Sequence, residues 1–269
     1  MLEEIGSSAA VYDFSLMVNG KQVTNFNGNE VKVELPYTLV PGENPNKIVV
    51  YYLTDEGKLE VIKNGKYDPA TGMVAFKAKH FSRYLAAYTE VSFHDLAGVK
   101  WASDAIEALA ARGIVQGVGN SQFNPENQVT RAEFITMLVN AFDLKDPTAT
   151  TTLADVQPSS WYYSSIASAQ KLGIVNGQSS TLFGVNDRIS RQDMAVMVYR
   201  TMQVMNAHSA TKNTLTTFTD QASIRSYALE AVASMQQAGI IEGMDNGNFA
   251  PTSLATRAQG AVVIFRLFE

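Results

Sequence analysis

Cysteine is absent from this 269-residue chain, and histidine occurs only three times. Without cysteine the chain forms no disulfide, thiol nucleophile or thiolate metal site. His80, His94 and His208 are isolated in the sequence and do not have the spacing of metal ligands. We therefore expect neither a metal site nor a cofactor, while the lack of cysteine does not identify the compartment.

Long apolar runs and a basic charge excess are also missing. No run of about 18 apolar residues occurs, so membrane insertion is not expected. The net charge of -5 provides no basic field, which argues against nucleic acid as a partner. Residues 1–4 are acidic where a signal peptide is basic, so no export signal is expected within this sequence.

Residues 1–90 have the patterning of β-strands. Short runs alternate polar and apolar side chains, and turn residues such as Asn64-Gly65 separate them. We expect strands at residues 30–35, 47–53, 58–62, 72–78 and 84–88. Short strands at these intervals predict an antiparallel β-sandwich-like domain, for which a spacer or assembly role is the cautious interpretation.

From about residue 91 onward, one short pattern occurs three times. Thr-Arg-Ala-Glu at residues 130–133 returns as Ser-Arg-Gln-Asp at 190–193 and as Thr-Arg-Ala-Gln at 256–259. The successive arginines are 60 and 66 residues apart. Such a period predicts a supersecondary unit with its own helices. Neighbouring units must pack, because one unit cannot bury its apolar face alone.

Each repeat contains two stretches with apolar residues at helical spacing. The first stretch begins with an aromatic residue and is followed by a glycine, where a left-handed C-cap is expected. These glycines are Gly113, Gly173 and Gly239. In the second repeat, the predicted apolar stripe consists of Trp161, Ile166, Ala169 and Leu172.

The repeated pattern has the form of a helix start. Thr130 and Glu133 fit a capping box, in which two backbone N–H groups are satisfied reciprocally. Ser190 with Asp193 is a weaker version, because aspartate is one methylene shorter. Capping does not require the arginine at the first helical position. A cation there opposes the helix dipole at a cost of about 0.3–1 kcal/mol.

Two explanations for the three arginines stay open. Each arginine could pair with the acid that leads its repeat or with a carboxylate of a neighbouring repeat. Alternatively, the guanidinium and the free N–H groups of the helix start form an anion site that grips a carboxylate. The leading acids are Asp95, Asp155 and Asp220.

The aromatic and glycine positions also have two interpretations. For Trp101, Trp161 and Tyr227, burial against the next repeat is the default, and stacking on a sugar face is the alternative. Turn geometry explains three further glycines, although glycine also lets backbone approach a ligand closely. These glycines are Gly117, Gly177 and Gly243.

Together these features resemble the S-layer homology (SLH) domain. The first repeat carries the whole pattern, in the order Phe93-x-Asp95, Trp101, Gly113-Ile114, Gly117, Phe123-x-Pro125 and Thr130 to Glu133. The resemblance implies a pseudo-threefold α-helical assembly of three repeats after the β-domain, which makes the fold class α+β with two domains. The expected boundaries are 1–90 for the β-domain and 91–150, 151–213 and 214–269 for the repeats.

The resemblance also implies a ligand: a secondary cell wall polysaccharide with pyruvylated N-acetylmannosamine, whose ketal carries a carboxylate. Grooves between repeats would bind it through Arg131, Arg191 and Arg257. The plausible lining is Trp101, Trp161, Tyr227, Gly117, Gly177 and Gly243. Because the second and third repeats depart from the pattern, we expect one or two competent grooves, the best of which pairs the first repeat with a neighbour.

The favoured function is a non-catalytic, extracellular anchor in the cell wall or S-layer of a Gram-positive bacterium. The alternative is a module for protein–protein contact or S-layer self-assembly. A glycosidase would need a pair of carboxylates facing a cleft. Glu133 and Asp193 are available, but capping explains both, and the third repeat has Gln259 instead. We therefore expect no enzyme activity.

Overall fold

The computed structural model describes all residues except 1–9, 24–25, 27, 208–210 and 269. His208, which was weighed above as a metal ligand, therefore lies outside the described residues. Contacts divide the chain into two compact units. The first consists of residues 1–94 and 103–122, and the second of residues 95–102 and 123–269. Each unit is described by itself.

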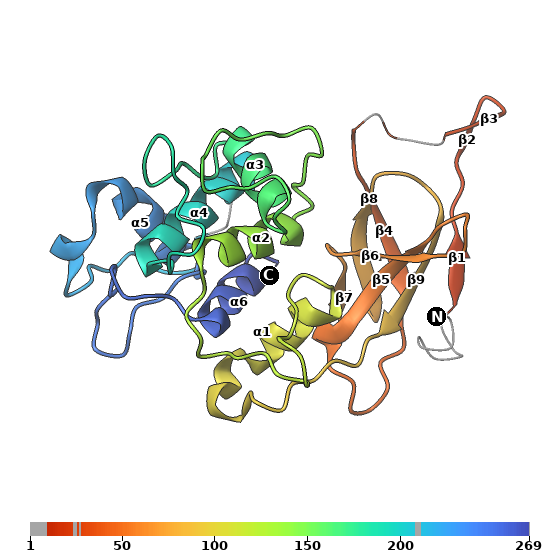
Figure 1. Ribbon diagram of the computed structural model, residues 1–269. Helices are drawn as coiled ribbons and strands as arrows, with labels where there is room; N and C mark the ends of the chain where they lie inside the picture. Colours follow the sequence, from red (N-terminus) through yellow and green to blue (C-terminus); the bar gives the residue numbers. More distant parts are fainter. Residues whose placement is uncertain (1–9, 24–25, 27, 208–210, 269) are drawn as a thin grey trace. The chain divides into compact units, whose positions relative to one another are not determined.

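Two antiparallel sheets form the N-terminal region (Figure 1). One sheet has the strand order β1-β9-β5-β6, the other has the order β4-β8-β7, and β2 and β3 form a separate hairpin. The strands are β1 (Val11–Asp13), β2 (Met17–Val18), β3 (Lys21–Gln22), β4 (Val31–Pro36), β5 (Ile48–Leu53), β6 (Leu59–Ile62), β7 (Lys66–Asp68), β8 (Met73–Ala78) and β9 (Arg83–Tyr88).

The inner faces of the two sheets share one apolar core, which confirms the predicted sandwich. Buried and exposed residues alternate in β4: Val33 and Leu35 are buried, whereas Lys32 and Glu34 are exposed. They pack in one cluster with buried residues of β5, β8 and β9, among them Tyr84. All five predicted strands are present. The sequence analysis missed β1, β2, β3 and β7, because two or three residues are too few to show alternation.

Six α-helices follow in the described part of the chain: α1 (Lys100–Ala111), α2 (Arg131–Ala141), α3 (Tyr163–Lys171), α4 (Arg191–Val204), α5 (Leu229–Gln237) and α6 (Arg257–Arg266). Single 3-10 turns are η2 (Pro45–Lys47), η3 (Ala97–Val99), η4 (Gln221–Ser223) and η5 (Ser226–Ala228). Within the described residues, no helix combines the length and the apolar character needed to cross a bilayer.

A closed ring of backbone hydrogen bonds joins the three repeats within the second unit. The amide of Val129 donates to the carbonyl of Ala255, that of Ala255 to Ile189, and that of Ile189 back to Val129, at 2.9–3.1 Å. Each of these buried residues stands directly before a helix N-cap. A ring of this kind requires three equivalent segments around one axis, so the repeats have the pseudo-threefold arrangement that the resemblance implied.

The first helix of each repeat ends as predicted but buries less of its stripe. Gly113, Gly173 and Gly239 all have positive φ, from 64° to 74°, which is the left-handed C-cap conformation. In the second repeat Ile166 and Ala169 are fully buried, as predicted. Leu172 is 38% exposed, so its assignment to the buried stripe was wrong. That residue caps the end of α3, where the chain turns away from the core.

Helix α1 packs on the sandwich within the first unit. Lys47 binds Glu107 of α1 at 2.7 Å, and Arg112 donates to the carbonyl of Asn46 at 2.6 Å. Both cations are buried, and their hydrogen bonds offset the desolvation cost. Burial lowers the pKa of Lys47, but Glu107 outweighs it, so that pKa is raised above its ordinary value. Burial lowers the pKa of Arg112 to about 10.

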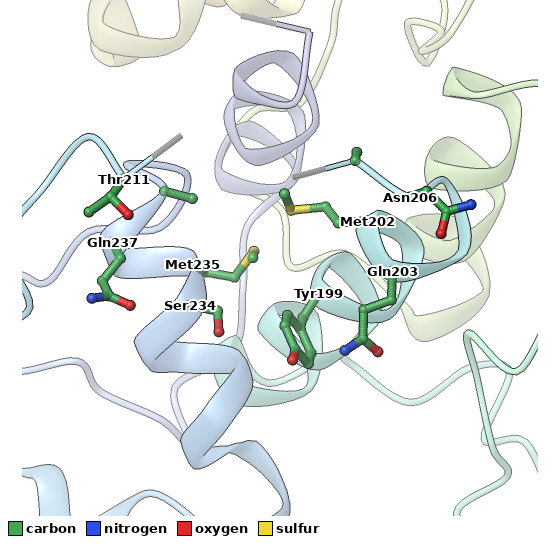
Figure 2. A pocket seen from close by; sticks show the side chains of 10 residues that line it. Tyr199, Met202, Gln203, Asn206, Thr211, Ser234, Met235 and Gln237 are labelled. Atoms are coloured by element: carbon green, nitrogen blue, oxygen red, sulfur yellow. The ribbon is translucent and has the colours of Figure 1, made fainter. Parts of the chain in front are cut away.

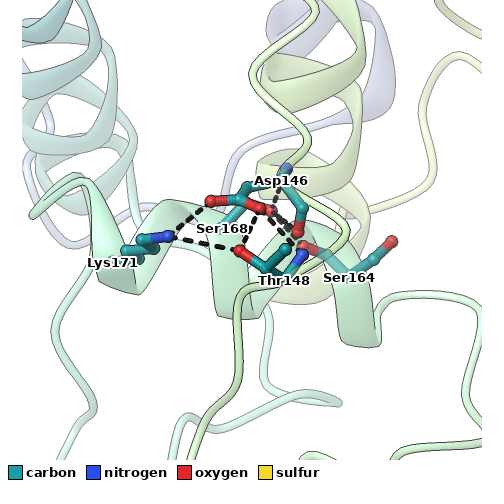
Figure 3. Close-up of polar contacts among 5 residues, drawn as sticks. All are labelled: Asp146, Thr148, Ser164, Ser168 and Lys171. Carbon is teal, nitrogen blue, oxygen red and sulfur yellow. Dashed lines mark hydrogen bonds and ion pairs between the residues drawn. The ribbon is translucent and has the colours of Figure 1, made fainter.

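A compact polar cluster fixes the connection between the first and second repeats (Figure 3). Asp146 accepts from Lys171 of α3 at 2.6 Å and from both the amide and the hydroxyl of Thr148. The hydrogen bond from Lys171 is the largest cause of the lowered pKa of Asp146. Ser168 completes the cluster by accepting from the Asp146 amide. The predicted polar connector is therefore an ordered structure that holds α3 in place.

Candidate functional site

The second helix of each repeat begins with the capping geometry that the sequence predicts. Thr130 accepts from the amide of Glu133 at 3.1 Å, and the Glu133 carboxylate accepts from the amide of Thr130 at 2.7 Å. Thr256 and Gln259 form the same box. Asp193 is too short to reach back, and its carboxylate instead accepts from the Ser190 hydroxyl at 2.7 Å. The other oxygen of this carboxylate, Oδ1, accepts from the Tyr227 hydroxyl at 2.7 Å.

The three arginines bind the loop of the next repeat in the ring. The Nε of each arginine donates to the backbone carbonyl of a phenylalanine in that loop at 2.9–3.0 Å. The guanidinium lies 4.6–5.2 Å from the centre of that phenylalanine's aromatic ring. The pairs are Arg131 with Phe183, Arg191 with Phe249 and Arg257 with Phe123. Cation–π contacts of this kind contribute about 0.5–2 kcal/mol. They offset the unfavourable dipole, an explanation that sequence reasoning did not consider.

The leading acids serve the loops. Asp155 accepts from the amides of Phe183, Gly184 and Val185. Burial raises the pKa of Asp155, but these three donors outweigh it, so that pKa lies below its ordinary value. Asp220 accepts two loop amides in the same way. Among the described residues, neither Asp155 nor Asp220 forms an ion pair with an arginine, so pairing with the leading acid, one of the alternatives left open, is absent in the second and third repeats.

The helix starts do not supply free N–H groups either. The amide of Arg131 donates to the carbonyl of Asp187 at 2.9 Å, and those of Arg191 and Arg257 donate to the corresponding carbonyls of Ser253 and Asn127. The caps take the amides at the third helical position. The amides at the first and third helical positions are therefore used within the chain and are not free for an anion.

One cavity of about 630 Å³ brings together residues from all three repeats. Arg131 comes from the first repeat, Gly177 from the second and Tyr227 from the third, and all three are among the predicted site residues. Asp193, Arg200 and Arg225 supply the other charged side chains of the lining. Apolar and amide side chains of the second repeat complete it. Cavities of this size are typical of small-molecule sites.

Arg131 is buried and incompletely bonded. Its side chain is only 8% exposed, and within the described residues only the carbonyl of Phe183 accepts a hydrogen bond from it. The carboxylate of Asp193, in the second repeat, forms an ion pair with it at 4.0 Å from Nη1, so for Arg131 the pairing with a neighbouring repeat's carboxylate, one of the explanations left open, is present. Burial lowers the pKa of Arg131, and Asp193 acts in the opposite direction. A buried guanidinium with unused donors is costly, which makes this cavity suited to an anionic ligand.

Tyr227 and Asp193 line the same cavity and are bonded to each other. The Tyr227 hydroxyl donates to Oδ1 of Asp193 at 2.7 Å. Burial, followed by Asp193, raises the pKa of Tyr227 to about 12, so the hydroxyl stays protonated at neutral pH. The ring is 52% exposed and presents an apolar surface beside a charged group. That combination suits the C–H face of a sugar with an acidic substituent.

The aromatic residues at the head of each repeat are exposed. Trp101 and Trp161 are 60% and 62% exposed, so burial against the next repeat was the wrong interpretation for them and for Tyr227. Trp161 and Tyr227 lie just before their α-helices, because α3 begins at Tyr163 and α5 begins at Leu229. Neither tryptophan is among the residues that line the Arg131 cavity.

The three further glycines share a packing reason. At Gly177 an added Cβ would lie 2.5 Å from the carbonyl oxygen of Leu182. At Gly117 and Gly243 it would lie 2.7 Å from the rings of Phe93 and Phe218. None of the three has positive φ, so turn conformation is not what requires glycine here. The close approach of neighbouring atoms requires it. Gly117 belongs to the first unit, whereas Gly177 and Gly243 belong to the second.

Arg191 is bonded differently from Arg131. Its Nη2 donates to the carbonyl of Glu242 at 2.9 Å, in addition to the bond from Nε to Phe249. Two backbone carbonyls thus use its donors, and its role is the closure of the ring. The three arginines have equivalent positions in the sequence but are not equivalent in available hydrogen-bonding capacity.

Sequence reasoning missed Arg200 and Arg225 and assigned Asp193 to capping alone. The imperfect Ser190–Asp193 cap was the available signal, since it leaves a carboxylate without its backbone partner. Arg225 stands two residues before the aromatic of its repeat, where the other repeats have Val99 and Ser159. A comparison of the repeats position by position would have found it.

A second cavity of about 520 Å³ lies between α4 and α5 (Figure 2). Tyr199, Met202 and Gln203 of α4 face Ser234 and Met235 of α5 across it. None of the described residues that line it is charged. It therefore offers no counter-charge for an acidic ligand, and the Arg131 cavity is the better candidate.

Comparison with known families accounts for the repeats. The S-layer homology domain model matches residues 92–135, 152–195 and 217–261. The three repeats are S-layer homology domains. The matched SLH segments each contain one four-residue helix start, so the pattern that the sequence repeats is part of the family's own unit.

Similar proteins are found among bacterial enzymes and surface-layer proteins. The chain is 35% identical over 237 residues to an amylopullulanase of Thermoanaerobacterium thermosulfurigenes, covering 88% of this chain and 13% of that protein. It is 35% identical over 179 residues to exoglucanase XynX of Acetivibrio thermocellus, covering 66% and 16%. It is 28% identical over 210 residues to the surface-layer 125 kDa protein of Lysinibacillus sphaericus, covering 77% and 17%.

The chain thus spans less than a fifth of the length of these relatives. Residues 91–269 number only 179, so at least 58 of the 237 residues aligned with the amylopullulanase come from the N-terminal region. The β-rich region is therefore shared with that relative together with the SLH repeats. The family match and the surface-layer relatives together support a cell-wall anchoring module and point to the cell surface.

Proposed function

We propose that the SLH repeats hold their parent protein to the cell wall by binding a pyruvylated secondary cell wall polysaccharide, with Arg131 as the principal contact. The observation that carries the proposal is the buried Arg131 side chain, whose Nη donors have no hydrogen-bond acceptor among the described residues. A ketal carboxylate fits a guanidinium fork in geometry and charge. On this proposal the chain is extracellular.

The rest of the cavity fits an acidic sugar. Tyr227 offers a half-exposed ring beside Asp193, and Gly177 allows the loop backbone to come close. Arg191, Arg257, Trp101, Trp161, Gly117 and Gly243 remain proposed as secondary positions. Arg191 ranks below Arg131 because two carbonyls already occupy its donors.

We propose a non-catalytic role for the repeats. Glycoside hydrolysis uses two carboxylates, whereas Asp193 is the one carboxylate among the described residues that line the cavity. Glu133 caps its own helix. The enzyme names of two relatives belong to proteins several times longer than this chain, and their printed activities are not transferred to the SLH repeats.

The proposal is tested by sedimentation of the chain with purified cell wall that contains the pyruvylated polymer. Wild type should co-sediment, and chemical removal of pyruvate should abolish this. Arg131→Ala should weaken binding by about 2–5 kcal/mol, the range for a desolvated charge pair. Co-sedimentation that survives both changes would contradict the carboxylate mechanism.

Self-association is the second candidate, favoured by the exposure of Trp101 and Trp161 outside the Arg131 cavity. Exposed aromatic side chains are frequent anchors of protein interfaces. Analytical ultracentrifugation without polysaccharide distinguishes the two functions. Concentration-dependent dimers that disappear in a Trp101→Ser/Trp161→Ser variant would support assembly, whereas a monomer at every concentration would exclude it.

A further inference from the structure

The Arg131 cavity carries more positive charge than one carboxylate would neutralise. Arg131, Arg200 and Arg225 line it with Asp193 as the opposing charge, which gives the charged lining a net +2. This local excess stands in a chain whose net charge is -5. Clustered like charges repel one another, so such a lining is favourable when an anionic ligand is bound.

Among the residues that the structure describes, Arg200 has no acidic partner, unlike its counterpart in the third repeat. Arg200 and Arg266 each follow the motif arginine by nine residues, and each donates to an equivalent carbonyl, at 3.5 and 3.3 Å. Arg266 also pairs with Glu242 at 3.2 Å. The residue of the second repeat that corresponds to Glu242 is Asn176, which also lines the cavity. The protein neutralises the guanidinium in one repeat and leaves it available in the other.

Arg225 is also available. Its backbone amide donates to Gln192, but within the described residues its side chain has no hydrogen bond or ion pair. Arg225, Arg131 and Tyr227 line the same cavity, and the charges of the two arginines oppose the rise in the pKa of Tyr227 that burial and Asp193 cause. Arg225 therefore adds its charge to the same cavity, at a position where the other two repeats have neutral residues.

We propose that this cavity binds a saccharide with two acidic groups. This inference rests on the proposed function: Arg131 takes the pyruvyl carboxylate, and Arg200 with Arg225 takes a second acidic group on the adjoining sugar. That second group is a carboxylate or a phosphate, since a guanidinium binds both. Two groups at separate positions also fix the direction of the polymer in the cavity, which a single carboxylate does not.

Calorimetric titration with three synthetic disaccharides tests the inference. Each contains pyruvylated N-acetylmannosamine, linked to glucose, to glucuronic acid or to glucose 6-phosphate. The glucose probe has one acidic group and nearly the same size as the others. Wild type should bind at least one of the two-acid probes about fivefold to tenfold more tightly than the glucose probe at low salt. The higher affinity for the two-acid probes should shrink in about 0.5 M salt, because the Debye length is then well below 10 Å.

Matched variants locate the second group. Two variants should each reduce the advantage of the two-acid probes to about twofold. Arg225→Gln removes a cation at an exposed position. Asn176→Glu introduces beside Arg200 the acid that the third repeat has there. The readout is the ratio of the two-acid to the one-acid affinity within each variant, so a general loss of affinity does not imitate the loss of the second contact. Arg266→Gln, outside the cavity, should leave the advantage unchanged. Circular dichroism melts confirm that the variants are folded.

Two results would overturn the inference while the proposed function stands. One is equal affinity of wild type for all three probes, and the other is an advantage that persists in both Arg225→Gln and Asn176→Glu. If wild type binds none of the three probes, the proposed function fails and the inference fails with it.

Discussion

The surroundings of Arg131 and Arg191 show how one sequence motif serves two purposes. Both arginines begin a helix, and both donate from Nε to a phenylalanine carbonyl beneath the guanidinium. Arg191 then uses Nη2 on the Glu242 carbonyl, whereas no described residue accepts a hydrogen bond from either Nη of Arg131. The difference lies outside the motif, so recurrence of the motif alone does not identify a ligand site.

The shared part of the motif is structural. The bonds to the neighbouring loop close the ring of repeats, and they are made by all three arginines. What distinguishes the Arg131 position is the cavity that Arg131 lines together with Asp193, Tyr227, Arg200 and Arg225. On the proposed function, binding needs the recurring arginine together with cavity residues that vary between repeats, while assembly uses the bonds that recur.

The largest expected effect is on ligand binding and separates the two arginines. Arg131→Gln should lower the affinity for pyruvylated polymer by about 2–5 kcal/mol, because the carboxylate loses its charged partner. Arg191→Gln should change the affinity by less than about threefold, provided that the variant is folded. Surface plasmon resonance on immobilised polymer measures both. Equal losses for the two variants would remove the distinction between the sites.

Thermal unfolding should rank the same two variants in the reverse order. Arg191→Gln leaves the carbonyls of Phe249 and Glu242 without their donor, and Arg131→Gln leaves only that of Phe183. Because a hydrogen bond to a charged group contributes about 1.5–3 kcal/mol, Arg191→Gln should be the more destabilising variant by about that amount. Differential scanning calorimetry gives the comparison, and a larger loss for Arg131→Gln would contradict it.

Tyr227→Phe measures what the Tyr227 hydroxyl contributes to the cavity. Loss of the 2.7 Å hydrogen bond to Asp193 should weaken polymer binding by about 1 kcal/mol, while the ring still provides its apolar face. The pKa of Tyr227 is raised to about 12, above the unfolded value. Its contribution to stability is therefore complete below about pH 10 and is lost as the pH rises towards 12. The wild-type melting temperature should fall over that range more steeply than that of Tyr227→Phe.

The smallest expected effect concerns the imperfect cap. Asp193→Glu supplies the missing methylene, so the carboxylate should reach the Ser190 amide as Glu133 reaches that of Thr130. A completed cap should stabilise the chain by about 0.5–1 kcal/mol. Polymer binding should weaken, because Tyr227 loses its acceptor. Chemical denaturation measures the first effect, and an unchanged or lower midpoint would show that the cap is not the limiting feature.

The local features of this fold could be predicted from the sequence. The contacts that each side chain makes with distant parts of the chain could not. Alternation gave the longer strands, helical spacing gave the paired helices, and glycine placement gave the C-caps at Gly113, Gly173 and Gly239. The capping boxes at Thr130 and Thr256 followed from side-chain length. These properties depend on neighbours in sequence, so they are visible in the chain itself.

The errors concern partners that are distant in sequence. Trp101 and Trp161 were expected to be buried, although exposure at a repeat boundary depends on how the next repeat packs. The carbonyl that accepts from Arg131 lies 52 residues away, and that for Arg257 lies 134 residues away. Arg225 enters the site because its segment in the third repeat packs on the second repeat, where the Arg225 amide donates to Gln192. Such juxtapositions have no local signature.

The most direct test of the account is calorimetric titration of the whole chain with synthetic pyruvylated N-acetylmannosamine and with the same sugar lacking pyruvate. We predict saturable heat for the pyruvylated sugar alone, and its loss in Arg131→Gln but not in Arg191→Gln. Equal binding of the two sugars, or full binding by Arg131→Gln, would show that the buried guanidinium is not the ligand's partner.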